Sequence, residues 1–135
     1  MRFTRITIIR TRKPESVNVN ELLQWFSGTL GLFNPRDKDR SCFRVFVALL
    51  NDVKKGADGL TSDELAEMTS LTRGTVVYHL NKLMESGLVV SERSKYFLKV
   101  NSLEQLVDVV RADVNTAFDS LKEKGKELDK MLGLK

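Results

Sequence analysis

The sequence predicts a mainly α-helical chain with one small β-hairpin, and three stretches carry this prediction. Residues 60–88, LTSDELAEMTSLTRGTVVYHLNKLMESGL, indicate two short helices joined by a tight turn. Two short segments rich in Val, Leu and aromatic residues follow and are typical of a hairpin. From Ser102 onward, apolar residues recur at spacings of three and four, which indicates one long helix. This order predicts a winged helix-turn-helix with an N-terminal extension and a long C-terminal dimerisation helix.

Residues 1–16 form the first segment, which is a basic strand or arm. Phe3, Ile6 and Ile8 alternate partly in strand fashion. The first thirteen residues also contain five basic side chains and no acidic one: Arg2, Arg5, Arg10, Arg12 and Lys13. Two interpretations compete: an edge strand with solvated arginines, or an arm that follows the DNA backbone or enters a minor groove. The apolar residues favour the strand, and Pro14 would end it.

Residues 17–36 are expected to hold an N-terminal helix at 18–33 that serves packing or dimerisation. Asn18 or Asn20 is its predicted cap. Its apolar stripe consists of Leu22, Leu23, Phe26 and Leu30. The Asn34-Pro35 pair predicts a turn after this helix.

Residues 37–101 are expected to form the winged helix-turn-helix domain, starting with a scaffold helix at 37–55. Asp37 or Asp39 is the predicted cap of this helix. Cys42 is expected to be a small buried apolar group beside the core stripe. That stripe consists of Phe43, Phe46, Leu49, Leu50 and Val53.

The helix-turn-helix carries clear start signals. Thr61 and Glu64 have the spacing of a capping box, and Leu60 and Leu65 that of a hydrophobic staple. Residues 68–71 are the predicted turn, with Leu71 as an apolar plug. The recognition helix is predicted at 72–86, with Thr72 as its cap and a buried stripe of Val76, Leu80 and Leu83.

The wing and the final helix complete the prediction. Strands are expected at 88–91 and 96–100, with the tip at 92–95, short and without glycine. Ser102 and Gln105 predict another capping box at the start of the helix in residues 102–135. Its stripe resembles a heptad seam that Lys124 and Gly125 interrupt. So long a stripe needs a partner, and a second copy of the chain is preferred over an intramolecular antiparallel packing.

Composition narrows the classes of function. The 135 residues suit one domain with extensions, and the net charge of +4 favours nucleic acid or an anionic membrane as partner. A single cysteine, Cys42, excludes an intrachain disulfide. With one histidine, His79, it also excludes a metal site built only from Cys and His within one chain. We expect no metal, no cofactor and no membrane segment, in a cytoplasmic, nucleoid-associated protein.

The segment TRGTVVYHLNKLMESGLVV resembles the recognition helix and strand entry of ArsR-type winged-helix regulators. Thr75-Val76, His79-Leu80 and Gly87-Leu88-Val89 match that pattern in order and spacing. The resemblance covers about half the chain and implies a prokaryotic, archaeal DNA-binding transcription regulator. Many ArsR-type regulators sense metals through paired cysteines, which are absent here, so metal sensing is not carried over.

The predicted DNA-binding residues lie on the recognition helix and the wing tip. Thr72, Arg73 and Thr75 come first and lie nearest the groove. Arg73 is expected to pair with a guanine or with a phosphate. Tyr78 is expected either to meet a thymine methyl group or a phosphate, or to be partly buried against the wing. The full set is Thr72, Arg73, Thr75, Val77, Tyr78, Asn81, Lys82, Arg93 and Lys95.

These observations predict a homodimeric, sequence-specific regulator that binds double-stranded DNA. Residues 102–135, and possibly the 18–33 helix, are the expected dimer contacts. The competing classes are a winged-helix protein-interaction module and a broadly acting, chromatin-like DNA binder. An enzyme is not expected, because the sequence contains no nucleophile elbow, metal cluster or phosphate loop.

Overall fold

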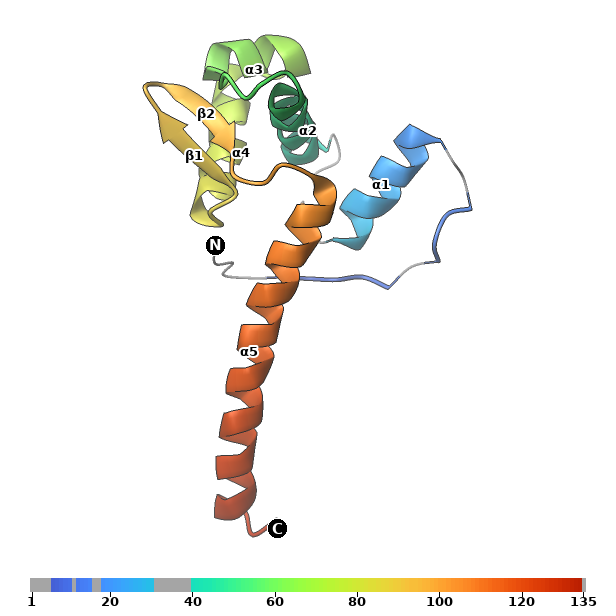
Figure 1. The fold of residues 1–135 in the computed structure, drawn as a ribbon, viewed down its shortest axis with the longest axis vertical. Helices are drawn as coiled ribbons and strands as arrows, with labels where there is room; N and C mark the ends of the chain where they lie inside the picture. The colour runs from blue at the N-terminus through green and yellow to red at the C-terminus, as the bar shows by residue number, and fades with distance from the viewer. Residues whose placement is uncertain (1–5, 11, 16–17, 31–39, 135) are drawn as a thin grey trace.

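The computed structural model describes residues 6–10, 12–15, 18–30 and 40–134, and it confirms the predicted fold class. In chain order the elements are α1 (Val19–Thr29), α2 (Ser41–Lys54), α3 (Ser62–Thr69), α4 (Arg73–Glu85), β1 (Val89–Glu92), β2 (Lys95–Leu98) and α5 (Leu103–Met131). In Figure 1, α2, α3, α4 and the hairpin form a head, and α5 projects far beyond it. No helix in the described part of the chain is long and apolar enough to cross a membrane.

A single apolar core joins the head to the start of α5. Phe46 and Leu49 of α2, with Leu80 of α4, are fully buried at its centre. The predicted stripe of α2 is confirmed for Phe43, Phe46 and Leu49, whereas Leu50 and Val53 are only partly buried. Cys42 is buried, as predicted. Burial of such side chains contributes about 1.5–3 kcal/mol each, so the head carries most of the stability of the chain.

The start of α3 has the predicted cap, but its end differs from the prediction. The Thr61 hydroxyl accepts from the Glu64 N–H at 3.1 Å, and the Glu64 carboxylate accepts from the Thr61 N–H at 3.1 Å. The helix includes Met68 and Thr69 and ends at Ser70, whose φ of 57° is left-handed. The turn is therefore shorter than the predicted 68–71, because Arg44 of α2 donates a hydrogen bond to the Thr69 carbonyl and helps to satisfy this helix end.

The wing is tighter than the sequence predicted. β1 and β2 are antiparallel, with Val89 opposite Leu98 and Glu92 opposite Lys95. The connecting turn contains only Arg93 and Ser94, with φ of 52° and 66°. The four-residue tip at 92–95 was therefore wrong, and the strands do not include residues 88, 99 and 100. A turn with two positive φ values matches the right-handed twist of the strands it joins, which is why two residues suffice.

A third backbone segment pairs with the hairpin. The N–H of Leu60 donates to the Tyr96 carbonyl at 3.1 Å, and the N–H of Tyr96 donates back at 2.8 Å. Next to this bridge, Gly59 has a φ of 83°, and a Cβ there would lie 2.5 Å from the Phe97 ring. Gly59 is thus required both by its backbone conformation and by the close approach of Phe97.

The described residues of the N-terminal segment include helix α1 and a bridge between Ile8 and Leu30. Asn18 caps α1, as predicted, by accepting from the Glu21 N–H at 3.1 Å. The helix ends at Thr29 and not at residue 33, because Leu30 leaves it to pair with Ile8. The predicted strand of the first segment is reduced to this bridge among the described residues, and Ile8 stays 58% exposed.

Several predictions for the first 40 residues lie outside the described residues. They concern Phe3, the Asn34-Pro35 turn, and the capping residues Asp37 and Asp39. At the start of α2, the residue in the cap position is Arg40, with a φ of 52° and no side-chain cap hydrogen bond.

The last helix is continuous and does not fold back. Ser102 caps α5 by accepting from the Gln105 N–H at 3.0 Å. The Gln105 side chain accepts from the Asn101 N–H at 2.6 Å and not from that of Ser102, so the reciprocal half of the predicted box is wrong. The helix runs through Lys124 and Gly125 to Met131. The expected alternative of an intramolecular antiparallel packing is absent from the described residues (Figure 1).

Candidate nucleic-acid interface

Helix α4 has one buried face and one exposed face. Val76, Leu80 and Leu83 face the core, as predicted, and His79 lies with them at 8% exposure. Of the predicted site residues, Thr72, Arg73, Tyr78, Asn81 and Lys82 are exposed, while Thr75 and Val77 are partly buried. The core thus fixes the rotation of α4 and presents its polar side to solvent.

The first turn of α4 offers backbone donors to a ligand. Thr72 caps the helix, as predicted: its hydroxyl accepts from the Thr75 N–H at 3.2 Å and donates to the Thr75 hydroxyl at 2.9 Å. The first turn contains no acidic side chain. A helix N-terminus carries partial positive charge, so this end of α4 favours a negatively charged group such as a phosphate.

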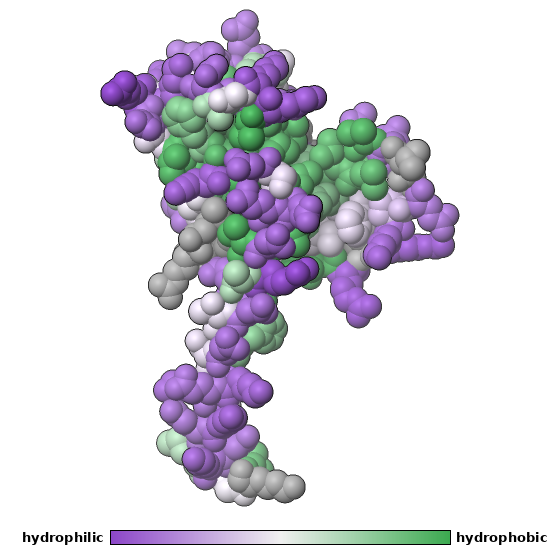
Figure 2. All heavy atoms as spheres, viewed as in Figure 1, coloured by the Kyte–Doolittle hydropathy of each residue, from purple (hydrophilic) through white to green (hydrophobic). Residues whose placement is uncertain are grey.

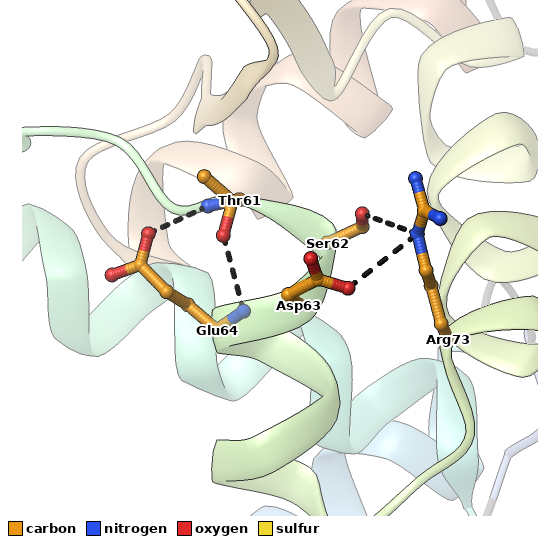
Figure 3. A network of polar contacts seen from close by, with 5 residues as sticks. All are labelled: Thr61, Ser62, Asp63, Glu64 and Arg73. Atoms are coloured by element: carbon orange, nitrogen blue, oxygen red, sulfur yellow. Dashed lines mark hydrogen bonds and ion pairs between the residues drawn. The ribbon is translucent and has the colours of Figure 1, made fainter.

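Arg73 is tied to the start of α3, a link that the sequence analysis missed. Its Nε donates to the Ser62 hydroxyl at 3.2 Å and lies 3.5 Å from a carboxylate oxygen of Asp63 (Figure 3). Figure 3 also shows that both contacts end at Nε, while the two terminal nitrogens point away from α3. The side chains of Arg73 and Asp63 are 71% and 81% exposed, so the pair contributes little to stability and can yield to another anion.

Tyr78 and Lys82 form a pair on the exposed face of α4. The Lys82 ammonium lies 4.6 Å from the centre of the Tyr78 ring, and the ring meets His79 edge-on at 5.2 Å. Tyr78 is 55% exposed, which argues against the alternative interpretation that its ring is buried against the wing. The cation and the buried imidazole both contact the Tyr78 ring and so help to fix its position on the exposed face.

Gly74, which the sequence analysis did not single out, lies between the predicted site residues Arg73 and Thr75. It lies in the first turn of α4, and a Cβ built there would meet no atom within 4 Å. Glycine costs about 0.5–1 kcal/mol relative to alanine inside a helix, so the fold itself would favour a larger residue. The backbone of the first turn of α4 is therefore bare and exposed at the position between Arg73 and Thr75.

The wing brings further cations to the same domain. Arg93 and Lys95 are both exposed, with Arg93 in the turn and Lys95 in β2 opposite Glu92. The pKa of Glu64 is held below its usual range by the hydrogen bonds from the backbone and hydroxyl of Thr61, with a smaller contribution from Lys95.

The loop that sets the distance between α3 and the wing is held by α2. The Asp52 carboxylate accepts from the Gly59 N–H at 3.0 Å, and Leu60 then pairs with β2. Sequence reasoning missed both contacts, and the isolated Gly-Leu pair before the capping box was the only available signal.

No group of three or more His, Cys, Asp or Glu residues that could hold a metal ion occurs among the described residues.

Comparison with known families agrees with this architecture. Residues 39–96 match the model of the MarR family. This segment is therefore similar to a family of winged helix-turn-helix transcription regulators. It contains α2, α3, α4 and β1, and it reaches Tyr96 in β2. The match does not bear on the predicted ArsR-type kinship or archaeal source. No curated protein and no solved structure matches the chain significantly.

Proposed function

We propose that the protein is a transcription regulator that binds specific sequences in double-stranded DNA as a homodimer, in the cytoplasm and on the nucleoid. The observation that carries this proposal is the exposed face of α4, which combines a cation-bearing first turn, a bare Gly74 and the Tyr78–Lys82 pair. The match of residues 39–96 to the MarR family supports it independently. In such folds the corresponding helix lies in the major groove.

The first turn of α4 is the proposed base-reading end. Arg73 would exchange its weak Asp63 contact for guanine O6 and N7, or for a phosphate, through its terminal nitrogens. Thr72 and Thr75 would meet the DNA beside it, with the Thr75 hydroxyl and the free helix N–H groups as donors to phosphate oxygens. Gly74 would allow the backbone to come close to the groove wall.

The remaining predicted residues would position the protein on the DNA and would contribute less to the recognition of particular bases. Tyr78 and Val77 would contribute ring and methyl surface to the groove, whereas Lys82 and Asn81 would clamp phosphates. Arg93 and Lys95 would place the wing tip on the DNA backbone. The two-residue turn is too short to cross a minor groove, so we assign it phosphate contacts alone.

Dimerisation is proposed because α5 keeps an apolar stripe in solvent. Phe118, Leu121 and Leu128 are 62%, 66% and 55% exposed. Exposed apolar surface of this extent marks an interaction site. Helix α1, with Val19 and Leu22 exposed, is the second proposed contact.

The test is fluorescence anisotropy of the purified full chain with duplex DNA from its own promoter and with random duplex DNA, across a salt series. We expect tighter binding to the promoter and a steep loss of affinity with salt. Equal affinity for both duplexes would instead favour the chromatin-like binder. Absence of binding at low salt would refute DNA binding and favour the protein-interaction module.

A further inference from the structure

The exposed stripe of α5 lies on the same helix face that contacts the head. Leu106 and Val110 are buried in the core, and Val114 packs partly against it. Continuing from these residues by steps of three and four leads to the exposed apolar side chains, which lie on one face because such steps complete whole turns. They are Ala117, Phe118, Leu121, Leu128, Met131 and Leu132. The same face of α5 therefore packs against the head up to Val114 and is exposed to solvent from there to the end of the helix.

The projecting part of α5 is well delimited. After Val114, every described residue except the partly buried Gly125 is exposed. Figure 2 shows this part as a mainly hydrophilic rod with separate hydrophobic patches. No part of the described chain covers the apolar face between residues 115 and 134. A partner can therefore cover this face only after Val114, because the head covers the same face of α5 before that residue.

We infer that a second copy covers this face with its own α5 running antiparallel, such that paired residue numbers sum to about 245 or 246. The inference deepens the proposed homodimer and rests on it. The centre of the exposed stretch 115–131 lies at residue 123, so this pairing covers that stretch completely in both copies. The C-terminal tip of each helix then ends beside residue 114 of the other copy, where the head begins.

The pairing matches side chains by size. Phe118 lies opposite Leu128 of the second copy, and Val114 lies opposite Met131 and Leu132. Leu121 lies opposite Gly125, which has no side chain and has open space around it. The two residues that interrupt the stripe, Lys124 and Gly125, are thereby both placed against a large apolar side chain. Lys124 keeps its charge satisfied by Glu127, 3.1 Å away on the same helix.

A parallel pair would be worse on two grounds. It would bring the two heads to the same end of the pair, and both heads would need the space between the two helices because each lies on the apolar face. It would also place Gly125 against Gly125 and Lys124 beside Lys124, which leaves a gap next to like charges. Residues 103–120 carry four acidic and one basic side chain, whereas residues 121–134 carry three acidic and four basic ones. Antiparallel helices bring these unlike halves together.

The test uses disulfide cross-linking of the full chain in a Cys42→Ala background. Phe118→Cys carrying a size tag is mixed with untagged Leu128→Cys, the subunits are allowed to exchange, and the mixture is oxidised. We expect the disulfide between the two different variants to predominate over either disulfide between identical chains. In the antiparallel pair, identical positions at 118 lie about 14 Å apart at 1.5 Å per residue, too far for a disulfide. Glu123→Cys, on the exposed polar side of α5, is the matched control and should not cross-link.

The outcomes separate this inference from the proposed function. Disulfides between identical chains, or a monomer by light scattering at high concentration, would overturn the antiparallel pair. The hetero-disulfide together with no DNA binding at low salt would support the pair and refute the proposed regulator. Spin labels at exposed Glu104 give a second measurement that does not depend on oxidation. The antiparallel pair predicts a separation of about 55 Å between the labelled helix positions, whereas a parallel pair predicts about 10 Å.

Discussion

Replacing Gly74 with alanine should strengthen the fold and weaken DNA binding at the same time. The structure leaves the new methyl group free of any contact within 4 Å, and Gly74 is not among the residues with positive φ. The free energy of unfolding should therefore rise by about 0.5 kcal/mol, at the lower end of the glycine-to-alanine range because the residue lies in the first helical turn. This gain corresponds to a rise in Tm of roughly 2 °C for a chain of this size.

The same methyl group should obstruct a DNA duplex that approaches the first turn of α4. We expect the promoter affinity of Gly74→Ala to fall roughly tenfold, equivalent to about 1.4 kcal/mol. The measurements are anisotropy titration and thermal unfolding on the same sample. Gly28→Ala in α1 is the matched control, because a Cβ there also meets nothing within 4 Å, and it should leave DNA affinity unchanged. Unchanged affinity in Gly74→Ala would refute the close approach and move the DNA away from this end of α4.

Four further outcomes test other parts of the molecule. Arg73→Ala should cost about 1–3 kcal/mol in promoter binding and relax the preference at one base position, whereas equal losses on all sequences would leave Arg73 a phosphate contact. Lys82→Ala should weaken binding to every duplex and reduce the salt slope by about one, and an unchanged slope would remove Lys82 from the interface. A chain ending after Asn115 should fold and be monomeric by light scattering, since Leu106 and the rest of the core-facing turns remain; a dimer would transfer the interface to α1. Because the folded pKa of Glu64 is depressed, its contribution to stability is present above the unfolded pKa and is lost as pH falls through the folded pKa. Glu64→Gln should therefore show a smaller acid-induced fall in Tm than the natural chain.

Features that depend on a few neighbouring residues were predictable from the sequence. The caps at Asn18, Thr61 and Thr72 were predictable because each cap side chain accepts a hydrogen bond from the backbone N–H three residues later in the chain. The buried stripe of α4 followed from helical periodicity. The wing strands were misplaced by a residue or two at their ends, since the turn at Arg93 and Ser94 contains none of the usual hairpin residues.

Features that join distant parts of the chain were not predictable. The Arg73–Asp63 pair, the Leu60–Tyr96 bridge and the burial of α5 up to Val114 all depend on how whole elements pack. Gly74 escaped notice for a different reason. The structure shows that a side chain at this position would meet no other atom within 4 Å, and a sequence pattern does not reveal such open space.

The bridge between Leu60 and Tyr96 connects the wing directly to the start of the helix-turn-helix. Leu60 immediately precedes Thr61, whose hydrogen bonds with Glu64 hold the first turn of α3. A force on the wing is therefore transmitted to the start of α3 through the single peptide bond between Leu60 and Thr61. Helix α3 contacts Arg73 in turn, because the Ser62 hydroxyl accepts a hydrogen bond from the Arg73 Nε. In the proposed complex, a force on the wing tip would therefore be transmitted to the first turn of α4 through Leu60, which is itself a core residue.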